Sequence, residues 1–242
     1  MYNLLISAGA ALVTFLLLTV PAVLAWWLSL LVALLAFVGV FYLISRLIMK
    51  KVVEIMETAT KDLQAQRVDK GIRELQSAMK YGKWQIYVTG QVNAQIGTVY
   101  YMKRDFSSAF PYLEKAFFKN WVAMGMLAIT YMKRGKKDKM KETFEKAVQG
   151  SPKEALLWNI YAYCLCEVDE PGKAKDVLEK GLKKVPGDEN TKQNLELLQA
   201  GKKMKMKGFG DMWLQFHLEG LGTIQKQQMA AMGGMKRRIV RR

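Results

Sequence analysis

The first 45 residues contain no Asp, Glu, Lys, Arg or His, and the first charged side chain is Arg46. As one helix this stretch would be about 67 Å long, roughly twice the ~30 Å hydrocarbon core of a bilayer. The chain must therefore fold back on itself. Pro21, followed by Trp26 and Trp27, favours a turn there, because proline removes a helix donor and tryptophan prefers the headgroup level. The predicted hairpin occupies residues 1–49, with spans at Leu4–Val20 and Trp27–Ile48.

Two other interpretations of this apolar stretch compete with the hairpin. A cleaved signal peptide usually begins with basic residues and has a 7–15-residue apolar core. Met1, Tyr2 and Asn3 carry no Lys or Arg, and the apolar run is far longer than that core. A single tilted span preceded by an interfacial segment stays open as the second alternative, because Leu4–Val20 is at the short end for spanning.

The orientation follows from the basic residues next to the membrane. Arg46, Lys50 and Lys51 follow the second span, whereas the turn between the spans has no charge. The positive-inside rule places both the N-terminus and the soluble part in the cytoplasm. Cys164 and Cys166 are two residues apart, so on a helix they point in different directions and no disulfide between them is expected. Two unpaired cysteines fit a reducing compartment. A bacterial inner membrane is the expected location.

The formal net charge of +16 is unevenly distributed. Residues 51–200 carry 25 basic and 19 acidic residues, a net of +6, whereas residues 201–242 carry 10 and 2, a net of +8. The composition predicts a globular region at 50–200, long enough for a core, and a basic, Met- and Gly-rich tail at 201–242.

The middle of the chain repeats a pattern of small and large apolar residues. Ala128 and Ala162 are equivalent and 34 residues apart, and Gly97 precedes Ala128 by 31. The three copies are Gly97, Tyr100, Ala109, Leu113 and Ala116; Ala128, Tyr131, Met140, Phe144 and Ala147, with Pro152; and Trp158, Ala162, Leu165, Ala174, Leu178 and Gly181, with Pro186. A repeat of this length indicates stacked supersecondary units.

This pattern resembles the tetratricopeptide repeat (TPR). Arg104-Asp105-Phe106 stands where that family has Gly-Asp-Tyr between its two helices. The resemblance covers roughly residues 52–200, with a degenerate pair at Val52–Gln66 and Val68–Tyr81 and a capping helix at Asp188–Ala200. The expected fold class is all-α: two transmembrane helices, then an α-solenoid of about three to four TPR-like helix pairs and a capping helix. A non-repeating helical bundle is the alternative.

The resemblance implies a groove, lined by the first helix of each repeat, that holds a peptide or helix from another protein. The mapped groove residues are mostly apolar or aromatic, which suits an amphipathic or hydrophobic helix. Alternatively, these side chains pack against a neighbouring helix or against the protein's own tail. The candidate groove residues are Thr98, Tyr101, Met102, Ile129, Met132, Lys133, Asn159 and Tyr163.

The tail contains a bulky apolar patch and a terminal basic cluster. Trp213 and Phe216 belong to the patch and are predicted to dock on the repeats or on a partner. The cluster is predicted to contact an anionic membrane surface or, less favoured, nucleic-acid phosphates; a disordered, solvated tail is the alternative. The basic cluster consists of Lys236, Arg237, Arg238, Arg241 and Arg242.

The sequence indicates no catalytic, cofactor or metal site. His217 is the only histidine and lies in the tail, which excludes a His-based triad or a His cluster from the repeat region. The predicted function is therefore not enzymatic: a membrane-anchored scaffold or adaptor that recruits protein partners at the cytoplasmic face. The alternatives are a membrane-associated nucleic-acid or ribosome-binding factor acting through the tail, and a receptor for hydrophobic precursor segments.

Overall fold

The computed structural model describes residues 1–21 and 23–219, and every regular element in that part of the chain is a helix. The predicted all-α class is confirmed. The contacts divide the chain into a first unit, Met1–Phe117, and a second unit, Phe118–Arg242. The domain boundaries predicted after residues 49 and 200 stay predictions.

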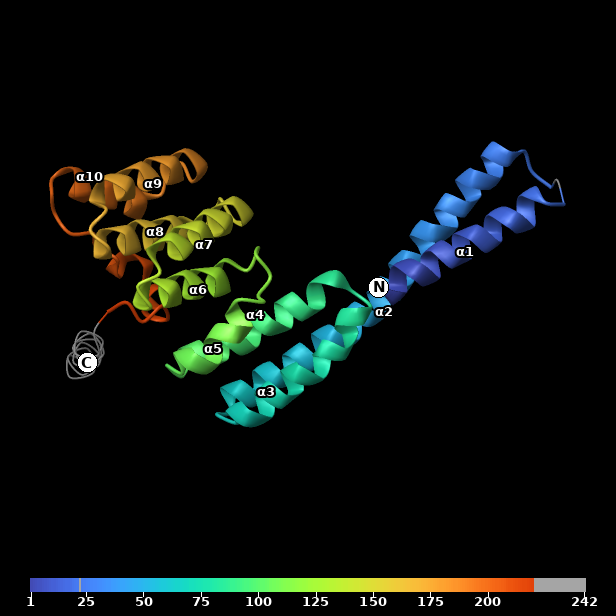
Figure 1. Cartoon of the computed structure of the whole chain (residues 1–242), viewed down its shortest axis with the longest axis horizontal. Helices are drawn as coiled ribbons and strands as arrows, with labels where there is room; N and C mark the ends of the chain where they lie inside the picture. The colour runs from blue at the N-terminus through green and yellow to red at the C-terminus, as the bar shows by residue number, and fades with distance from the viewer. Residues whose placement is uncertain (22, 220–242) are drawn as a thin grey trace, which may run out of the picture. The chain divides into compact units, whose positions relative to one another are not determined.

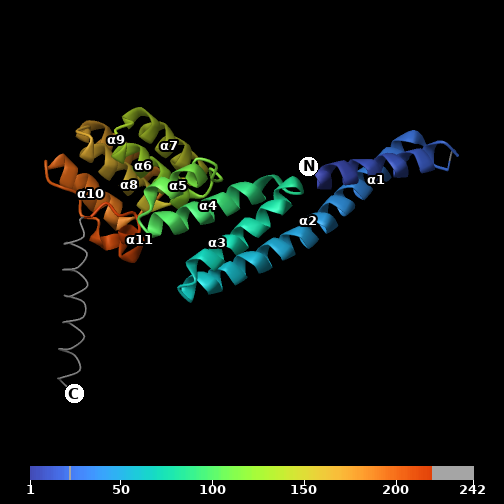
Figure 2. The ribbon, with the colours of Figure 1, turned by 60° about the horizontal axis from the view of Figure 1, so that its bottom comes forward.

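The elements of each unit are coloured along the chain in Figure 1, and Figure 2 shows the same elements from a second direction. Those of the first unit are α1 (Tyr2–Thr19), α2 (Trp26–Gln64), α3 (Val68–Ser77), the 3-10 helix η1 (Ala78–Lys83), α4 (Ile86–Met102) and α5 (Phe106–Leu113). Those of the second unit are α6 (Trp121–Lys133), α7 (Lys137–Gly150), α8 (Ala155–Glu167), α9 (Pro171–Lys184), α10 (Glu189–Gln199), the 3-10 helix η2 (Lys207–Phe209) and α11 (Asp211–Leu214).

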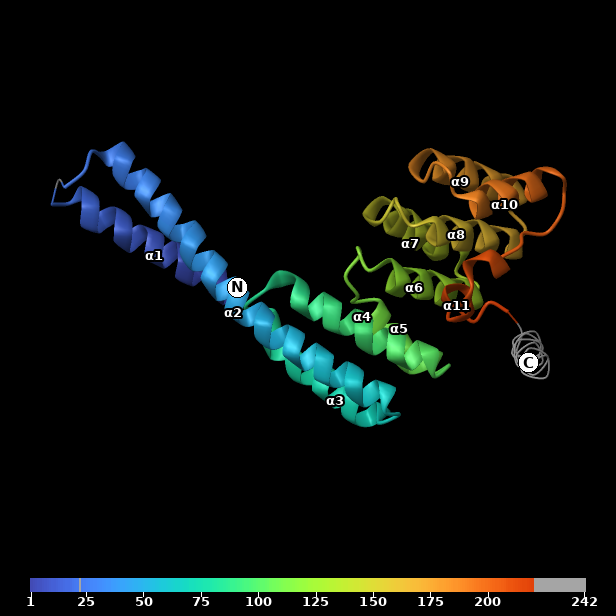
Figure 3. The ribbon, with the colours of Figure 1, turned by 180° about the vertical axis from the view of Figure 1, so that it is seen from behind.

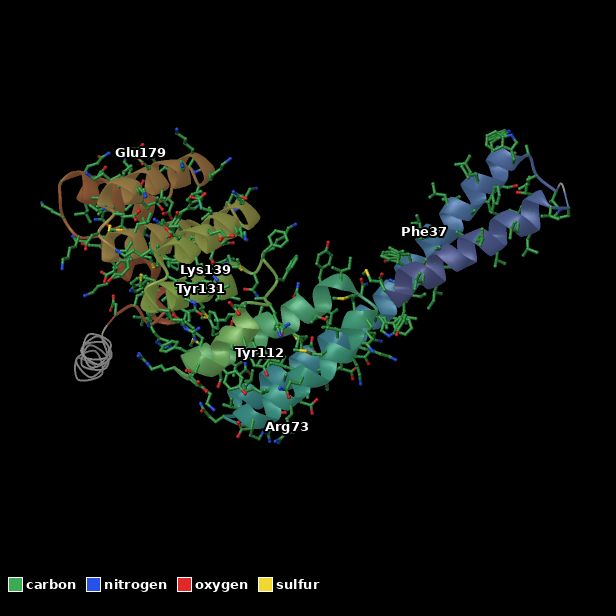
Figure 4. All side chains as sticks on the ribbon, in the orientation of Figure 1. Phe37, Arg73, Tyr112, Tyr131, Lys139 and Glu179 are labelled. Atoms are coloured by element: carbon green, nitrogen blue, oxygen red, sulfur yellow. The ribbon has the colours of Figure 1, made fainter. Side chains whose placement is uncertain are left out.

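Helix α1 and the first part of α2 form a hairpin (Figure 1), and both helices are long and apolar enough to cross a membrane. Its polar side chains point inward: Asn3, Ser7 and Ser29 are fully buried, and the Asn3 Nδ2 donates to Ser45 Oγ at 2.7 Å. Its large apolar side chains point outward, as Figure 4 shows around α1 and α2, and Leu35 is 70% exposed. This arrangement is the reverse of a water-soluble helical hairpin.

Helix α2 runs without a break from this apolar stretch into a charged one. Its 39 residues correspond to about 58 Å, and no Pro or Gly occurs between Gly39 and Gly71. The second half of α2 packs on α3 and η1, and a shared apolar cluster joins these elements to α4. That cluster comprises Val52, Ala59, Ile72, Leu75, Ala78, Val88, Val92 and Ile96. The apolar hairpin is therefore joined to the rest of the first unit by one continuous helix.

Helices α4 and α5 pack closely because a glycine stands where they approach. A Cβ atom at Gly97 would lie 2.8 Å from the Leu113 side chain, so a larger residue would force the helices apart. Asp105 begins α5, and its side chain accepts a hydrogen bond from the Ser108 backbone N–H at 3.0 Å. In the first predicted repeat, Gly97 therefore allows close helix packing, and Asp105 caps the second helix of the pair.

In the second unit, the repeated positions form the interior of the helix pairs α6/α7 and α8/α9. Gly181 allows α9 to approach Trp158, from which a Cβ would be only 2.9 Å away. The rings of Phe144 and Tyr161 stack at 4.9 Å between α7 and α8. The fully buried repeated positions are Ala128, Met140, Phe144, Ala147, Ala162, Leu165, Ala174 and Leu178.

Charged side chains also join successive helix pairs. Glu170, before α9, binds Lys173 at 2.8 Å and Lys141 of α7 at 3.0 Å. Hydrogen bonds from Lys173 and Lys141 lower the pKa of Glu170 to about 2. Because this pKa is depressed by folding, the interaction stabilises the second unit at neutral pH, and the contribution is lost as the pH falls from about 4.5 toward 2.

We expect Glu170→Gln to lower the melting temperature of the second unit at neutral pH and to reduce its dependence on pH in that acidic range. Thermal unfolding of the full chain in detergent, followed by circular dichroism, measures both. Glu142→Gln is the control, because Glu142 and its partner Lys146 are both exposed, and exposed pairs contribute little. Identical acid profiles for the wild type and Glu170→Gln would contradict this role.

Candidate protein-binding face

The predicted groove residues differ in how accessible they are. In the first unit, Thr98 is partly exposed and Met102 is 47% exposed, whereas Tyr101 is buried with its ring edge-on to Phe106 at 5.0 Å. In the second unit the same set ranges from buried to exposed. Ile129 and Asn159 are fully buried, Met132 and Tyr163 are partly exposed, and Lys133 is exposed.

A segment of the chain itself covers the α6–α8–α10 side of the second unit. We call residues 202–219 the C-terminal strap; they include η2 and α11. Figure 3 shows this segment in front of α6 and close to α8, and Figure 1 shows it behind the same helices. The side chains that meet the strap come from α6, α8 and α10, and we call this surface the strap-binding face.

One asparagine of the strap-binding face, Asn194, holds the strap backbone, and a second one, Asn159, holds Asn194 in place. The Asn194 Oδ1 accepts a hydrogen bond from the backbone N–H of Lys205 at 2.7 Å. Asn194 in turn donates from Nδ2 to the Oδ1 of Asn159 at 2.9 Å, and Asn159 Nδ2 donates to Thr191 Oγ1 at 2.7 Å. All three side chains are almost completely buried. This paired network, which continues from the Thr191 hydroxyl to the Asp188 carboxylate, recognises a backbone amide, a group that every peptide carries.

Trp213 anchors the strap against α8. It is 1% exposed, and its ring meets Tyr163 edge-on with the centroids 4.9 Å apart. Its indole N–H donates to Glu219 Oε1 at 2.8 Å, which satisfies the polar end of the side chain within the strap. Burial, followed by the charge of nearby Glu167, raises the pKa of Tyr163 to about 12, so this hydroxyl stays neutral at physiological pH.

Phe216 anchors the strap against α6. It is fully buried, and its ring stacks on Trp121 at 6.2 Å. The absence of a side chain at Gly125 makes this contact possible, because all three atoms nearest to a Cβ built there belong to Phe216, the first at 3.1 Å. One residue further on, the His217 carbonyl accepts a hydrogen bond from Lys133 Nζ at 3.2 Å.

The structure thus brings together five of the predicted site residues. Lys133, Asn159 and Tyr163 lie on the strap-binding face, and Trp213 and Phe216 lie on the strap. Trp121 and Asn194 also lie at this interface, although the predicted site did not include them. The predicted basic cluster, residues 236–242, lies outside the described part of the chain.

Among the residues that the structure describes, no group of three or more His, Cys, Asp or Glu side chains is placed to hold a metal ion. Burial raises the pKa of the Cys164 thiol, which keeps it protonated and unreactive. A cavity of about 340 Å³ lies among α7, α8 and α9, with Trp158 and Tyr161 in its lining. The Tyr161 hydroxyl donates to Glu145 at 3.2 Å, and burial raises its pKa too.

Comparison with known proteins adds no assignment, because no family model and no characterised protein matches the chain.

Proposed function

We propose that the chain is a membrane-anchored adaptor that binds a segment of another protein on the strap-binding face. The observation that carries this proposal is how the strap is held: its backbone by Asn194, and two of its aromatic side chains by the helices. Hydrogen bonds to the backbone and sites for separate side chains are the two components of peptide recognition. The C-terminal strap is then the resting occupant, and a partner with similarly spaced aromatic residues competes with it.

The anchor is the α1/α2 hairpin, inserted in a membrane. Its outward apolar and inward polar side chains support insertion, since a lipid-facing surface must be apolar and buried polar groups must find partners inside. Arg46, Lys50 and Lys51 favour a cytoplasmic second unit. The proposed membrane is a bacterial inner membrane. The proposed stacking of the helix pairs is of the TPR type, and it is supported by the 34-residue spacing and the close approaches at Gly97 and Gly181.

A labelled peptide with the sequence of residues 202–219 tests this function. We expect weak binding to the wild-type chain, because its own strap competes at an effective concentration of about millimolar. The variant Trp213→Ala/Phe216→Ala should bind the peptide at least tenfold more tightly, since its own strap lacks both anchors. Fluorescence anisotropy on the full chain in detergent or nanodiscs provides the measurement.

A third variant with Gly125→Leu added to the two alanines is the control. Leucine favours a helix more than glycine does, and its side chain would occupy the space of Phe216. This variant should lose the gain in peptide affinity while keeping its helical circular dichroism. Peptide binding that is equal in all three proteins would contradict the proposed function.

A further inference from the structure

A short segment of the first unit combines aromatic and basic residues with no acidic one. This junction segment, residues 80–87, joins η1 to α4 and contains Lys80, Tyr81, Lys83, Trp84 and Tyr87. We propose that the junction segment lies in the headgroup layer of the bilayer that holds the hairpin, as a second contact with anionic phospholipid. This inference rests on the proposed insertion of α1 and α2.

The contact between Trp84 and Tyr2 fixes the depth of the junction segment. The two rings meet edge-on with their centroids 5.4 Å apart. Tyr2 is the first residue of α1, and the adjacent Asn3 is hydrogen-bonded to Ser45, directly before Arg46, where the charged part of α2 begins. Trp84 therefore lies level with the boundary between the apolar and the charged part of the hairpin, which in an inserted hairpin is the headgroup region.

The exposed side chains of the junction segment fit that environment. Ile86 and Tyr87 are large apolar or aromatic side chains, yet they are 58% and 56% exposed. Lys80 and Lys83 of the same segment are also exposed. Tyrosine and tryptophan favour the membrane–water interface, and lysine extends its charge toward anionic headgroups. Arg46 adds a third exposed positive charge where the hairpin leaves the apolar region.

The junction segment has a compact backbone that presents these residues from a fixed place. Gly82 lies so close to Thr89 that a side chain at position 82 would collide with the Thr89 hydroxyl. The glycine therefore lets η1 turn directly into α4. Tyr87 is supported from behind by Phe117, whose ring lies 4.9 Å away. Continuity with the hairpin and complementary charge both select lipid as the occupant of this surface, rather than a second protein.

Fluorescence quenching by lipid measures the depth directly. Single-cysteine versions of the full chain, made on Cys164→Ala/Cys166→Ala, carry an environment-sensitive fluorophore at Leu35→Cys, Tyr87→Cys or Arg73→Cys. Leu35 reports insertion of the hairpin, and Arg73 lies on α3, far from the hairpin (Figure 4). The protein is reconstituted in phosphatidylcholine vesicles with or without phosphatidylglycerol, containing a nitroxide on either the headgroup or the acyl chain.

We expect the headgroup nitroxide to quench position 87 several-fold more than position 73, and the acyl-chain nitroxide to quench position 35 most. Lys80→Glu/Lys83→Glu should reduce quenching at position 87 in anionic vesicles and leave position 35 unchanged. Quenching at position 87 as weak as at position 73, with position 35 quenched, would overturn the inference but not the insertion. An unquenched position 35 would overturn the insertion and this inference with it.

Discussion

Replacing Trp213 and Phe216 with alanine should release the C-terminal strap from the second unit. Both side chains are almost fully buried, and truncating a buried aromatic residue typically costs about 3–5 kcal/mol. In the full-length double variant, hydrogen exchange measured by mass spectrometry should show that residues 202–217 exchange close to the rate of an unstructured peptide. In the wild type, the Lys205 amide should exchange slowly, because it donates to the buried Asn194.

Met212→Ala is the matched control for the strap. Met212 lies next to Trp213 but is 46% exposed, so its truncation removes little buried surface and should leave the strap protected. The helices α6 to α9 should keep their protection in both variants. If the strap of Trp213→Ala/Phe216→Ala stayed as protected as that of the wild type, the two aromatic residues would not be its anchors.

The second large effect concerns the hairpin. Leu31→Arg/Leu35→Arg places two charges on the outward face of α2, where the wild-type side chains are 50% and 70% exposed. Each arginine at the centre of a membrane span costs about 2.5–3.5 kcal/mol on the insertion scale. The fraction of the chain that resists alkaline extraction from membranes should therefore fall sharply.

Val53→Arg is the control for this charge effect. Val53 is also exposed on α2, but it follows Lys50 and Lys51, outside the apolar stretch, so an arginine there should leave extraction unchanged. For a hairpin exposed to water, the two arginines at 31 and 35 would be harmless or would improve solubility. Unchanged extraction of Leu31→Arg/Leu35→Arg would thus count against a membrane-spanning hairpin.

Local signals in the sequence predicted the helices well. The predicted spans Leu4–Val20 and Trp27–Ile48 correspond to α1 and the first part of α2. The predicted capping helix Asp188–Ala200 corresponds to α10. Such features depend on composition, caps and periodicity within one helix, all of which a single sequence contains.

The strap-binding face depends on contacts between distant positions. Asn159 and Asn194 are 35 residues apart, and Lys133 and the His217 carbonyl are 84 apart. Nothing in the local pattern around Asn194, a polar residue on a polar helix, indicates that it holds a backbone amide. The sequence did indicate docking of Trp213 and Phe216, because large aromatic side chains among glycines need a covering surface, but it left that surface open between the repeats and a partner.

Some of the predicted groove residues are buried and therefore contribute to stability. Ile129 lies one helical turn after Gly125 and is fully buried, and Tyr101 is buried against Phe106. A charged substitution at either position would therefore reduce stability as well as any binding. Tests of partner binding are better made at Gly125, where a new side chain would meet Phe216.

Photo-crosslinking from position 163 tests most directly whether the strap-binding face holds this segment. A benzoylphenylalanine replaces Tyr163 in the otherwise wild-type full chain in membranes, where the Tyr163 and Trp213 rings are 4.9 Å apart. We predict an intrachain cross-link from position 163 to residues 211–217 that is independent of protein concentration and is lost in Trp213→Ala/Phe216→Ala. Cross-links from position 163 to other parts of the chain or to lipid, with none to the strap, would contradict the account.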